Sequence, residues 1–488
     1  MGNVSRILRM SPVLLLAAVV AVALVMVLGG SRTMAGSGDA QMPARVQAEG
    51  LTADQEIQRQ IDLTGRLLRD LPSASQLRQV NVLFGQDEID AIDRGDKSST
   101  PLKIGLVKAI TPAVEVNGLD LVPGSNLPRK GTTGVAIPTR DGGYVWALAV
   151  NADQAGAIRL HVENLSLPRG AELYVYSRSG EVYGPYTGTG IDESGEFWAP
   201  AVFGREAIVQ VLVSPGASLR DVSFRITEAG IITQKAAGDL SMVPEATSFC
   251  GNAECIVDAS CYPQAASIWN AYAKQEWIAG AYIYTCTGAL LNDSNPTLSN
   301  FFLTANHCYS KAKTATTVSF YWWFRTSTCN GTCPTNTGWP YKTTGGTLRS
   351  TSKYGDYTLV TVNTTPPAGS VFLGWTSVAV ANTNGVALHR VSNPIFGPQV
   401  YSEDTVDTTA PTCTGWPRGE RIYSRTTLGG TDGGSSGSPV VNSSNQVVGQ
   451  LSGSCGTNVG DPCDHVSNAT VDGAFAYYYA TVKTYLAP

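Results

Sequence analysis

Strand-length hydrophobic runs dominate the middle of the chain. Between residues 102 and 233 they recur at short intervals, over 144–150, 157–162, 172–176 and 207–213. Turn-forming segments such as Asp141-Gly142-Gly143 and Pro168-Arg169-Gly170 separate them. Short strands at this regular spacing predict a β-sandwich over residues 101–235.

The first hundred residues have a different pattern. Residues 1–35 combine Arg6 and Arg9, an unbroken apolar run over 13–28 and small residues near Ala35, which predicts a cleaved export signal. The alternative is an uncleaved membrane anchor, and in both cases the bulk of the chain lies outside. Residues 36–100 are expected to form a linker, disordered over 36–50, with an amphipathic helix over 51–72.

Composition limits the class of protein. The chain has 488 residues, 43% of them hydrophobic and 15% charged, with a net charge of −5. This is enough for two or three domains, and plentiful Gly, Ser and Thr favour an all-β architecture. Since there is no basic stripe, we expect no nucleic-acid partner.

The cysteines indicate the compartment. All ten lie between Cys250 and Cys463, and their spacing does not match paired metal-ligand motifs. An even number of cysteines in an exported chain predicts disulfides formed in an oxidising compartment. We therefore expect a secreted protein with no metal site and no cofactor.

One serine lies in an unusually glycine-rich loop. Residues 429–439 place Ser436 among glycines, which allow a sharp turn that can aim several backbone N–H groups at one point. The alternative is a flexible turn between two strands. Two other residues favour chemistry: His307 ends a strand-like run beside Cys308, and Asp356 begins another, so the chain order is His, Asp, Ser.

The motifs Thr304-Ala305-Asn306-His307-Cys308 and Gly434-Ser435-Ser436-Gly437-Ser438-Pro439 resemble those of the chymotrypsin/trypsin-like serine peptidases, in the bacterial lysyl-endopeptidase-like branch. The resemblance covers residues 250–488 and implies a double β-barrel. It implies Ser436 as nucleophile, His307 as base and Asp356 as the residue that orients His307. It also implies an oxyanion hole made by the N–H groups of Gly434 and Ser436.

The same resemblance implies three disulfides. Cys286 would pair with Cys308, Cys261 with Cys329, and Cys255 with either Cys455 or Cys463. The partners of the remaining cysteines, among them Cys250, Cys333 and Cys413, stay open. Ser435 stands where animal trypsins carry the aspartate that binds a newly cut N-terminus, so activation by that ion pair is not expected.

Substrate selection is less well marked. The segment 449–453 resembles the strand that pairs with an extended substrate, which makes Ser452 and Gly453 candidate binding residues. A lysine-cutting enzyme needs a carboxylate in its S1 pocket. Alignment without a gap places Thr470 at that position, and a two-residue gap places Asp472 there. A basic P1 residue and a small or apolar one both remain open.

These observations together predict a secreted serine endopeptidase made as a precursor, with protein or peptide substrates. Residues 101–235 are interpreted as a pro-region that acts as inhibitor or folding aid, and residues 236–249 as the processing junction. We expect the enzyme to be a monomer. The alternative is a secreted binding protein whose N-terminal β-sandwich does the work, with a peptidase fold as scaffold.

Overall fold

The computed structural model describes residues 39–95, 100–120, 133–191, 193–238, 249–339 and 341–487. Strands prevail over helices, so the all-β class expected from the sequence is confirmed. The expected export signal and the stretch 239–248 of the expected junction lie outside the described residues. No helix within the described ranges is long and apolar enough to cross a membrane.

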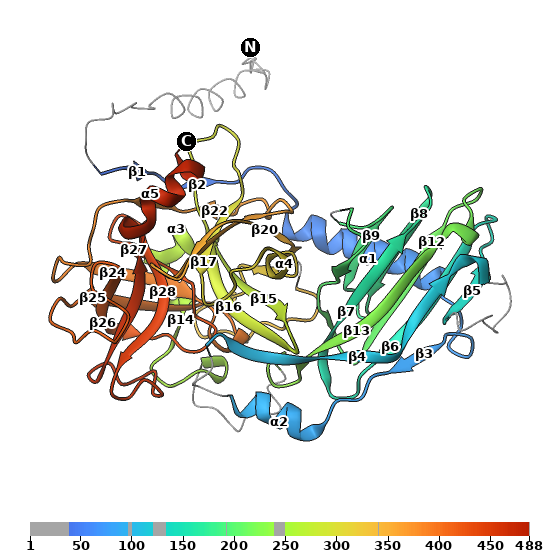
Figure 1. Cartoon of the computed structure of the whole chain (residues 1–488), viewed down its shortest axis with the longest axis horizontal. Coiled ribbons are helices and arrows are strands. Elements are labelled where there is room, and N and C mark those ends of the chain that lie inside the picture. The colour runs from blue at the N-terminus through green and yellow to red at the C-terminus, as the bar shows by residue number, and fades with distance from the viewer. Residues whose placement is uncertain are drawn as a thin grey trace, which may run out of the picture. The chain divides into compact units, whose positions relative to one another are not determined.

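The N-terminal domain consists of two facing sheets (Figure 1). One sheet has the order β3–β6–β12–β8–β9, with β5 also paired to β6. Its strands are β3 (Gln79–Asn81), β5 (Val135–Pro138), β6 (Tyr144–Asn151), β8 (Ala171–Tyr176), β9 (Val182–Tyr186) and β12 (Glu206–Val213). The facing strands are β4 (Leu102–Asn117), β7 (Ala155–Ser166), β10 (Phe197–Trp198), β11 (Val202–Phe203) and β13 (Ser223–Thr233).

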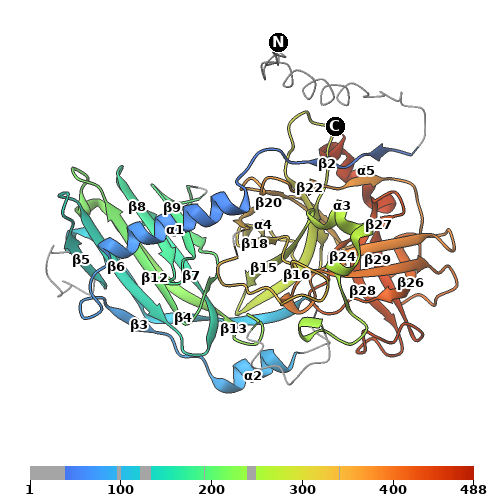
Figure 2. The same cartoon turned by 180° about the vertical axis from the view of Figure 1, so that it is seen from behind.

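The sandwich buries apolar side chains between its layers, including Leu148 of β6, Leu160 of β7 and Val211 of β12. Every residue from Val145 to Val150 is fully buried. In a sheet with one face exposed to solvent, buried and exposed residues would alternate, so both faces of this sheet must be covered. The second face of this sheet is covered by helix α1 (Ala53–Asp70), whose Leu67 packs against Tyr174 and Tyr176 (Figure 2).

Helix α1 begins with a capping box between Thr52 and Gln55. The predicted apolar positions of this helix are only partly buried: Leu67 is fully buried, whereas Ile57 and Ile61 are 42% and 57% exposed. A second helix, α2 (Gln86–Arg94), adds Ile89 to the main core. Residues 41–46, expected to be disordered, instead form β1 (Gln41–Met42) and β2 (Arg45–Val46), which pair with strands of the C-terminal domain.

Strand β4 joins the two domains into one continuous sheet. Its first residues pair with β16 (Tyr282–Leu290) of the C-terminal domain, with Leu102 opposite Thr285 and Leu106 opposite Tyr282. Further along, the same strand pairs with β13 of the sandwich, as its long course in Figure 1 shows. The domain that the sequence predicts as separable is therefore hydrogen-bonded to its neighbour through the backbone.

The first half of the C-terminal domain is a seven-stranded layer in the order β19–β18–β15–β16–β17–β21–β20. It buries an aromatic core that includes Trp277, Phe302 and Phe320. Its elements are β15 (Tyr272–Ala279), β16, β17 (Phe301–Ala305), β18 (Ser319–Trp322), β19 (Lys342–Thr344), β20 (Gly346–Ser352) and β21 (Tyr357–Val362), with α3 (Ala266–Trp269) and α4 (Ala312–Ala315) beside them.

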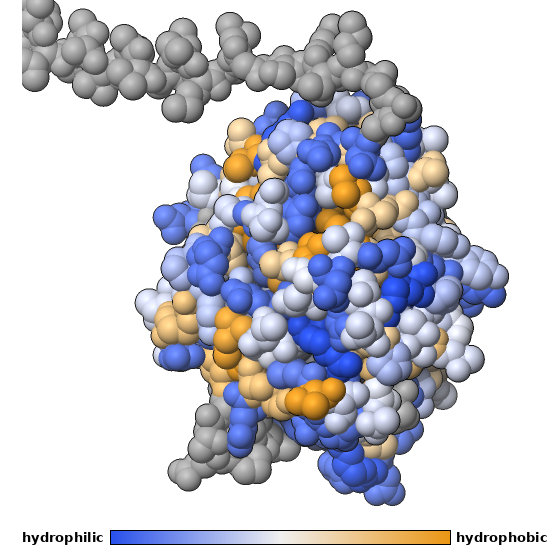
Figure 3. Space-filling view, turned by 90° about the vertical axis from the view of Figure 1, so that its left-hand side faces the viewer, coloured by the Kyte–Doolittle hydropathy of each residue, from blue (hydrophilic) through white to orange (hydrophobic). Residues whose placement is uncertain are grey.

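The second half is a closed barrel of six strands in the cyclic order β24–β25–β26–β29–β28–β27. These are β24 (Ala387–Ser392), β25 (Val400–Val406), β26 (Arg421–Gly429), β27 (Pro439–Asn442), β28 (Gln446–Gly456) and β29 (Asn468–Ala474). Short strands β14 (Val257–Asp258), β22 (Val371–Phe372) and β23 (Gly374–Thr376) flank the two halves, and helix α5 (Phe475–Leu486) closes the chain. On the outer face of this barrel, the hydrophobic surface residues are separated from one another by hydrophilic residues (Figure 3).

Five disulfides cross-link the C-terminal domain. They join Cys250 to Cys333, Cys255 to Cys463, Cys261 to Cys329, Cys286 to Cys308, and Cys413 to Cys455. Of the two partners left open for Cys255, the structure therefore has Cys463, because Cys455 is bound to Cys413. Most of these bridges join two loop segments rather than two strands.

Candidate active site

The two halves of the C-terminal domain meet at a cavity of about 900 Å³ that His307, Asp356 and Ser436 all line. His307 follows the end of β17, Asp356 immediately precedes β21, and Ser436 lies three residues before β27. Residues distant in sequence are brought together because β17 and β21 pair side by side, which sets the loops at their ends against each other.

Asp356 holds His307 through two atoms. Its Oδ2 lies 2.8 Å from Nδ1 of the ring, and its Oδ1 accepts the backbone N–H of His307 at 3.0 Å. Burial by itself raises the pKa of Asp356, but the charge and hydrogen bonds of His307 outweigh it and keep that pKa below its ordinary value. The carboxylate therefore stays ionised at neutral pH. Because it engages Nδ1 of the ring, Nε2, which lies 4.0 Å from Cys308 Sγ, is the nitrogen that can exchange a proton with a substrate or nucleophile.

The Asp356 loop is fixed by contacts from the barrel half of the domain. Gln450 on β28 donates from Nε2 to the carbonyl oxygens of Gly355 and Asp356, both at 2.9 Å. The hydroxyl of Tyr478 on α5 in turn donates to Oε1 of Gln450. The position of the carboxylate thus depends on packing between the two halves of the domain.

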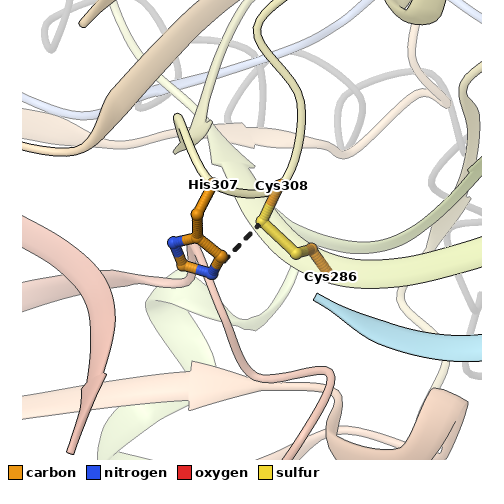
Figure 4. A group of neighbouring side chains, drawn as sticks. All are labelled: Cys286, His307 and Cys308. Carbon is orange, nitrogen blue, oxygen red and sulfur yellow. Dashed lines mark hydrogen bonds between the residues drawn. A yellow bond between two sulfur atoms is a disulfide. The ribbon is translucent and has the colours of Figure 1, made fainter. Parts of the chain in front are cut away.

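The disulfide Cys286–Cys308 lies directly beside the ring of His307, as Figure 4 shows. It ties the loop after β17 to strand β16 and so restrains the histidine. The two sulfurs and the imidazole are close enough to resemble a metal-ligand group. Both sulfurs are consumed in the disulfide, however, and neither can offer the thiolate that a metal would need.

Two glycines shape the loop that carries Ser436, where the sequence predicts an oxyanion-binding site. Gly434 adopts a φ of +98° and Gly437 a φ of +80°, both in the region that favours glycine. Among the hydrogen bonds of the described residues, none uses the backbone N–H of Gly434 or of Ser436 as donor. Neither N–H group therefore has an acceptor among the described residues, and Ser436 itself lines the cavity.

The predicted substrate-binding residues divide into two pairs. Ser452 and Gly453 line the cavity together with Thr431, Asp432 and Gly433. Thr470 does not line it, and its hydroxyl lies 3.0 Å from that of Thr426 in the barrel wall.

Asp472 is also placed away from the cavity, fully buried against Arg390, with Nη1 and Oδ1 2.8 Å apart. The suggestion that Asp472 receives a substrate cation is wrong, because this carboxylate already neutralises an internal arginine. In the C-terminal domain, the carboxylates that do line the cavity are Asp356 and Asp432.

Sequence reasoning missed one side of the cavity entirely. Residues of the N-terminal domain, namely Asp93, Arg94, Leu102, Lys103 and Lys235, also line it. The strand-like run after Pro101 predicts a strand, but no local signal indicates which sheet edge that strand joins. Its pairing with β16 spans nearly two hundred residues of sequence, so only the folded structure reveals it.

Comparisons with known proteins agree with this architecture. Residues 250–466 match the family model of the lysyl endopeptidase C-terminal domain, and residues 137–229 match that of the lysyl endopeptidase N-terminal domain. A lysyl endopeptidase of Pseudomonas aeruginosa is 26% identical over 412 residues, which cover 80% of this chain and 83% of the relative.

Solved structures of proteases are similar over part of the chain. The active form of a protease from M. tuberculosis covers 50% of this chain and 94% of its own, at 15% identity and a TM-score of 0.32. The HtrA-type protease AlgW with a tripeptide covers 46% of this chain and 62% of its own, at 11% identity and a TM-score of 0.32. By its two matched family domains and its curated relative, the chain belongs to the lysyl-endopeptidase branch of the chymotrypsin/trypsin-like serine peptidases and is a serine endopeptidase.

Proposed function

We propose that the protein is a secreted serine endopeptidase, made as a precursor, that cleaves peptide bonds through His307, Asp356 and Ser436. The observation that carries the proposal is the His307–Asp356 pair, joined by two hydrogen bonds, in the cavity that Ser436 also lines. Support also comes from the free N–H groups of Gly434 and Ser436.

The reaction follows from these positions. The hydroxyl oxygen of Ser436 attacks the peptide carbonyl carbon while its proton passes to Nε2 of His307. The oxygen that becomes negative accepts hydrogen bonds from Gly434 and Ser436, and Asp356 stabilises the imidazolium. His307 then gives its proton to the leaving amine as the C–N bond breaks. Water, deprotonated by His307, releases the acyl group from Ser436 by the same route.

The N-terminal domain is well placed to act as inhibitor. It contributes Leu102, Lys103 and Lys235 to the wall of the cavity, and a Cβ added to Gly433 would lie 3.5 Å from Leu102 Cδ1. A substrate entering along this wall would meet β4, which occupies the edge of β16. Removal of the domain by a cut within 236–249 would expose this edge.

The domain border also supports a role in folding. Glu181 and Lys342 form an ion pair across it with both side chains almost fully buried. Arg159 donates from Nη2 to the carbonyl of Thr317 at 2.9 Å. Export to an oxidising compartment is supported by the five disulfides of the C-terminal domain.

A fluorophosphonate probe, which reacts with activated serines, tests the proposal directly. We expect labelling of the secreted wild-type protein, none of Ser436→Ala, and an intact mass of about half the chain for the labelled species. Labelling of the full-length secreted chain would support the catalytic assignment but contradict the proposal that the enzyme is made as a precursor. Absence of labelling in every wild-type form would overturn the catalytic assignment, and ligand binding retained by residues 101–235 would then favour the binding protein.

A further inference from the structure

The loop that carries Ser436 is held by hydrogen bonds to three successive carbonyl groups. The carbonyl oxygen of Gly433 accepts the N–H of Ile395 at 2.6 Å, and that of Gly434 accepts the hydroxyl of Thr287 at 2.9 Å. The carbonyl oxygen of Ser435 accepts the N–H of Ser438 at 3.0 Å. Each bond fixes the plane of one peptide group in this loop.

Fixing a carbonyl also fixes the N–H on the other side of the same peptide group. In a trans peptide the C=O and N–H bonds point in opposite directions. Because the Gly433 oxygen is turned toward Ile395, the N–H of Gly434 must point away from Ile395. The bond from Ser438 to Ser435 sets the N–H of Ser436 in the same manner. Ile395 therefore controls the direction of one of the two proposed oxyanion donors.

The turn that presents Ile395 has an unusual backbone. Ile395 has a φ of +50° and Phe396 a φ of +62°, a region that a β-branched residue rarely enters. Bonds around the turn maintain it: the N–H of Gly397 donates to Pro394 O at 2.7 Å, and Nδ2 of Asn393 donates to Gly397 O at 3.0 Å. Such a backbone conformation persists only where surrounding contacts hold it in place.

Thr287 connects this turn to the serine loop. Its hydroxyl donates to Gly434 O and accepts the N–H of Asn393, both at 2.9 Å. Its own backbone N–H donates to Ser436 O at 2.9 Å. Thr287 is fully buried on β16, next to Cys286 of the disulfide that restrains His307.

Lys274 supports the turn from below. Its side chain is fully buried, and Nζ donates to Phe396 O at 2.9 Å and to Oδ1 of Asn336. The rings of Phe324 and Phe396 surround the amine, with centroids 3.4 and 3.9 Å from Nζ. Among the ion pairs of the described residues, none includes Lys274, so its polar contacts are directed to the turn and to Asn336.

We propose that Thr287, the turn from Asn393 to Gly397, and Lys274 form an oxyanion clamp that holds the Gly434 N–H toward the reacting carbonyl. These are positioning residues, and the inference rests on the function proposed above. The clamp explains how the loop is ordered without an ion pair at Ser435, whose hydroxyl accepts hydrogen bonds from Ser392 Oγ at 3.0 Å and from the N–H of Asp432 at 3.4 Å.

The test compares the same substitution at two positions of β16, in enzyme secreted and processed from the full-length chain. Thr287→Val keeps the side-chain volume but removes the hydroxyl that links the Gly434 carbonyl to the N–H of Asn393, and so loosens the turn whose Ile395 orients the Gly434 N–H. We expect kcat to fall 10- to 100-fold with KM changed less than about twofold, since loss of a whole oxyanion donor costs about 100-fold or more. Affinity for a peptidyl boronate, whose tetrahedral adduct occupies the oxyanion hole, should fall by a similar factor. Thr287→Ser should restore both.

Thr285→Val is the matched control. Thr285 is also fully buried, and its hydroxyl donates to Gln275 O at 2.8 Å, away from the serine loop. It should lose thermal stability as Thr287→Val does but keep its kcat and boronate affinity. If Thr287→Val does not fold, Lys274→Met serves as the second variant, with the same expected loss of kcat and boronate affinity.

Two results would be decisive against the clamp. Wild-type kcat and boronate affinity in a folded Thr287→Val or Lys274→Met would overturn it, as would equal losses in Thr285→Val. Both are distinguishable from failure of the proposed function, which would appear as wild-type protein that neither hydrolyses peptides nor reacts with a fluorophosphonate.

Discussion

The two domains of this chain are both built from β-strands, yet they are stabilised in different ways. The N-terminal domain contains no cysteine and buries one large aliphatic cluster between two facing sheets. The C-terminal domain divides its core among smaller clusters and carries all five disulfides. Facing sheets bury their side chains along whole strands, whereas the two halves of the C-terminal domain meet at a cleft between loops, and most of the disulfides join such loops.

The two domains also differ in where they bury charged side chains. In the C-terminal barrel, Arg390 lies fully buried between Asp472 and Asp404, with Nε 3.7 Å from Asp404 Oδ2. In the N-terminal domain, Arg159 and Glu181 are buried only where the other domain covers them. The sandwich therefore places the buried Arg159 and Glu181 at the border with the other domain.

Removal of Arg390 should have the largest effect. Burial raises the pKa of Asp472, and Arg390 opposes this, so Arg390→Met leaves a carboxylate without its cation. We expect a loss of about 3–5 kcal/mol in the unfolding free energy of the C-terminal domain, measured by denaturant unfolding. Arg225→Met is the control in the other domain, where the pair with Glu115 is exposed and should contribute below about 1 kcal/mol. Equal losses in the two variants would contradict the comparison.

Loss of the Cys286–Cys308 disulfide should come next. The bridge closes a loop of 22 residues, so the double variant Cys286→Ala/Cys308→Ala should lose about 3 kcal/mol. We also expect a lower kcat, because the loop that carries His307 is released. Hydrogen exchange should show faster exchange in β16 and β17 and no change in β6 and β12. Faster exchange in the sandwich would show that the domains do not differ as described.

The ion pair at the domain border should have an intermediate effect. Lys342→Met leaves Glu181 buried without its partner, which should weaken the association of the domains by about 2 kcal/mol. In calorimetry of the full-length chain, we expect one unfolding transition to separate into two. Adding Glu181→Gln should recover part of the loss, because no charge is then left unpaired. A single unshifted transition in Lys342→Met would mean that the pair does not hold the domains together.

What the sequence could predict depended on the range of the interaction. The residues His307, Asp356 and Ser436 lie in local motifs, so their presence in one cavity could be expected. The N–H of Ile395 on Gly433 and the pairing of β4 with β16 join distant segments and leave no local signal. The suggested role of Asp472 in the S1 pocket failed for a related reason. Its position along the chain gives no sign that the side chain faces Arg390, which lies in a distant segment.

The smallest expected loss of stability comes from replacing a turn aspartate, one in each domain, and this loss depends on pH. Asp407 accepts the N–H and hydroxyl of Thr409 at 2.8 and 2.6 Å, and Nε of Arg425 at 3.1 Å, which lower its pKa to about 2. The pKa in the unfolded chain is about 3.9, so the stabilisation is complete above pH 4 and is lost as pH falls toward 2.

Asp407→Asn should therefore cost about 1 kcal/mol or less at pH 6, given screening by solvent, and nothing near pH 2. The matched variant in the cysteine-free domain is Asp141→Asn. Asp141 also has a lowered pKa, from the hydroxyl of Thr139 and the N–H of Gly143, but it has no arginine beside it among its described contacts. Its loss at pH 6 should be smaller and less sensitive to salt, measured by thermal unfolding at both pH values. A penalty for Asp407→Asn that persists at pH 2 would mean that the turn depends on the shape of the side chain rather than on its charge.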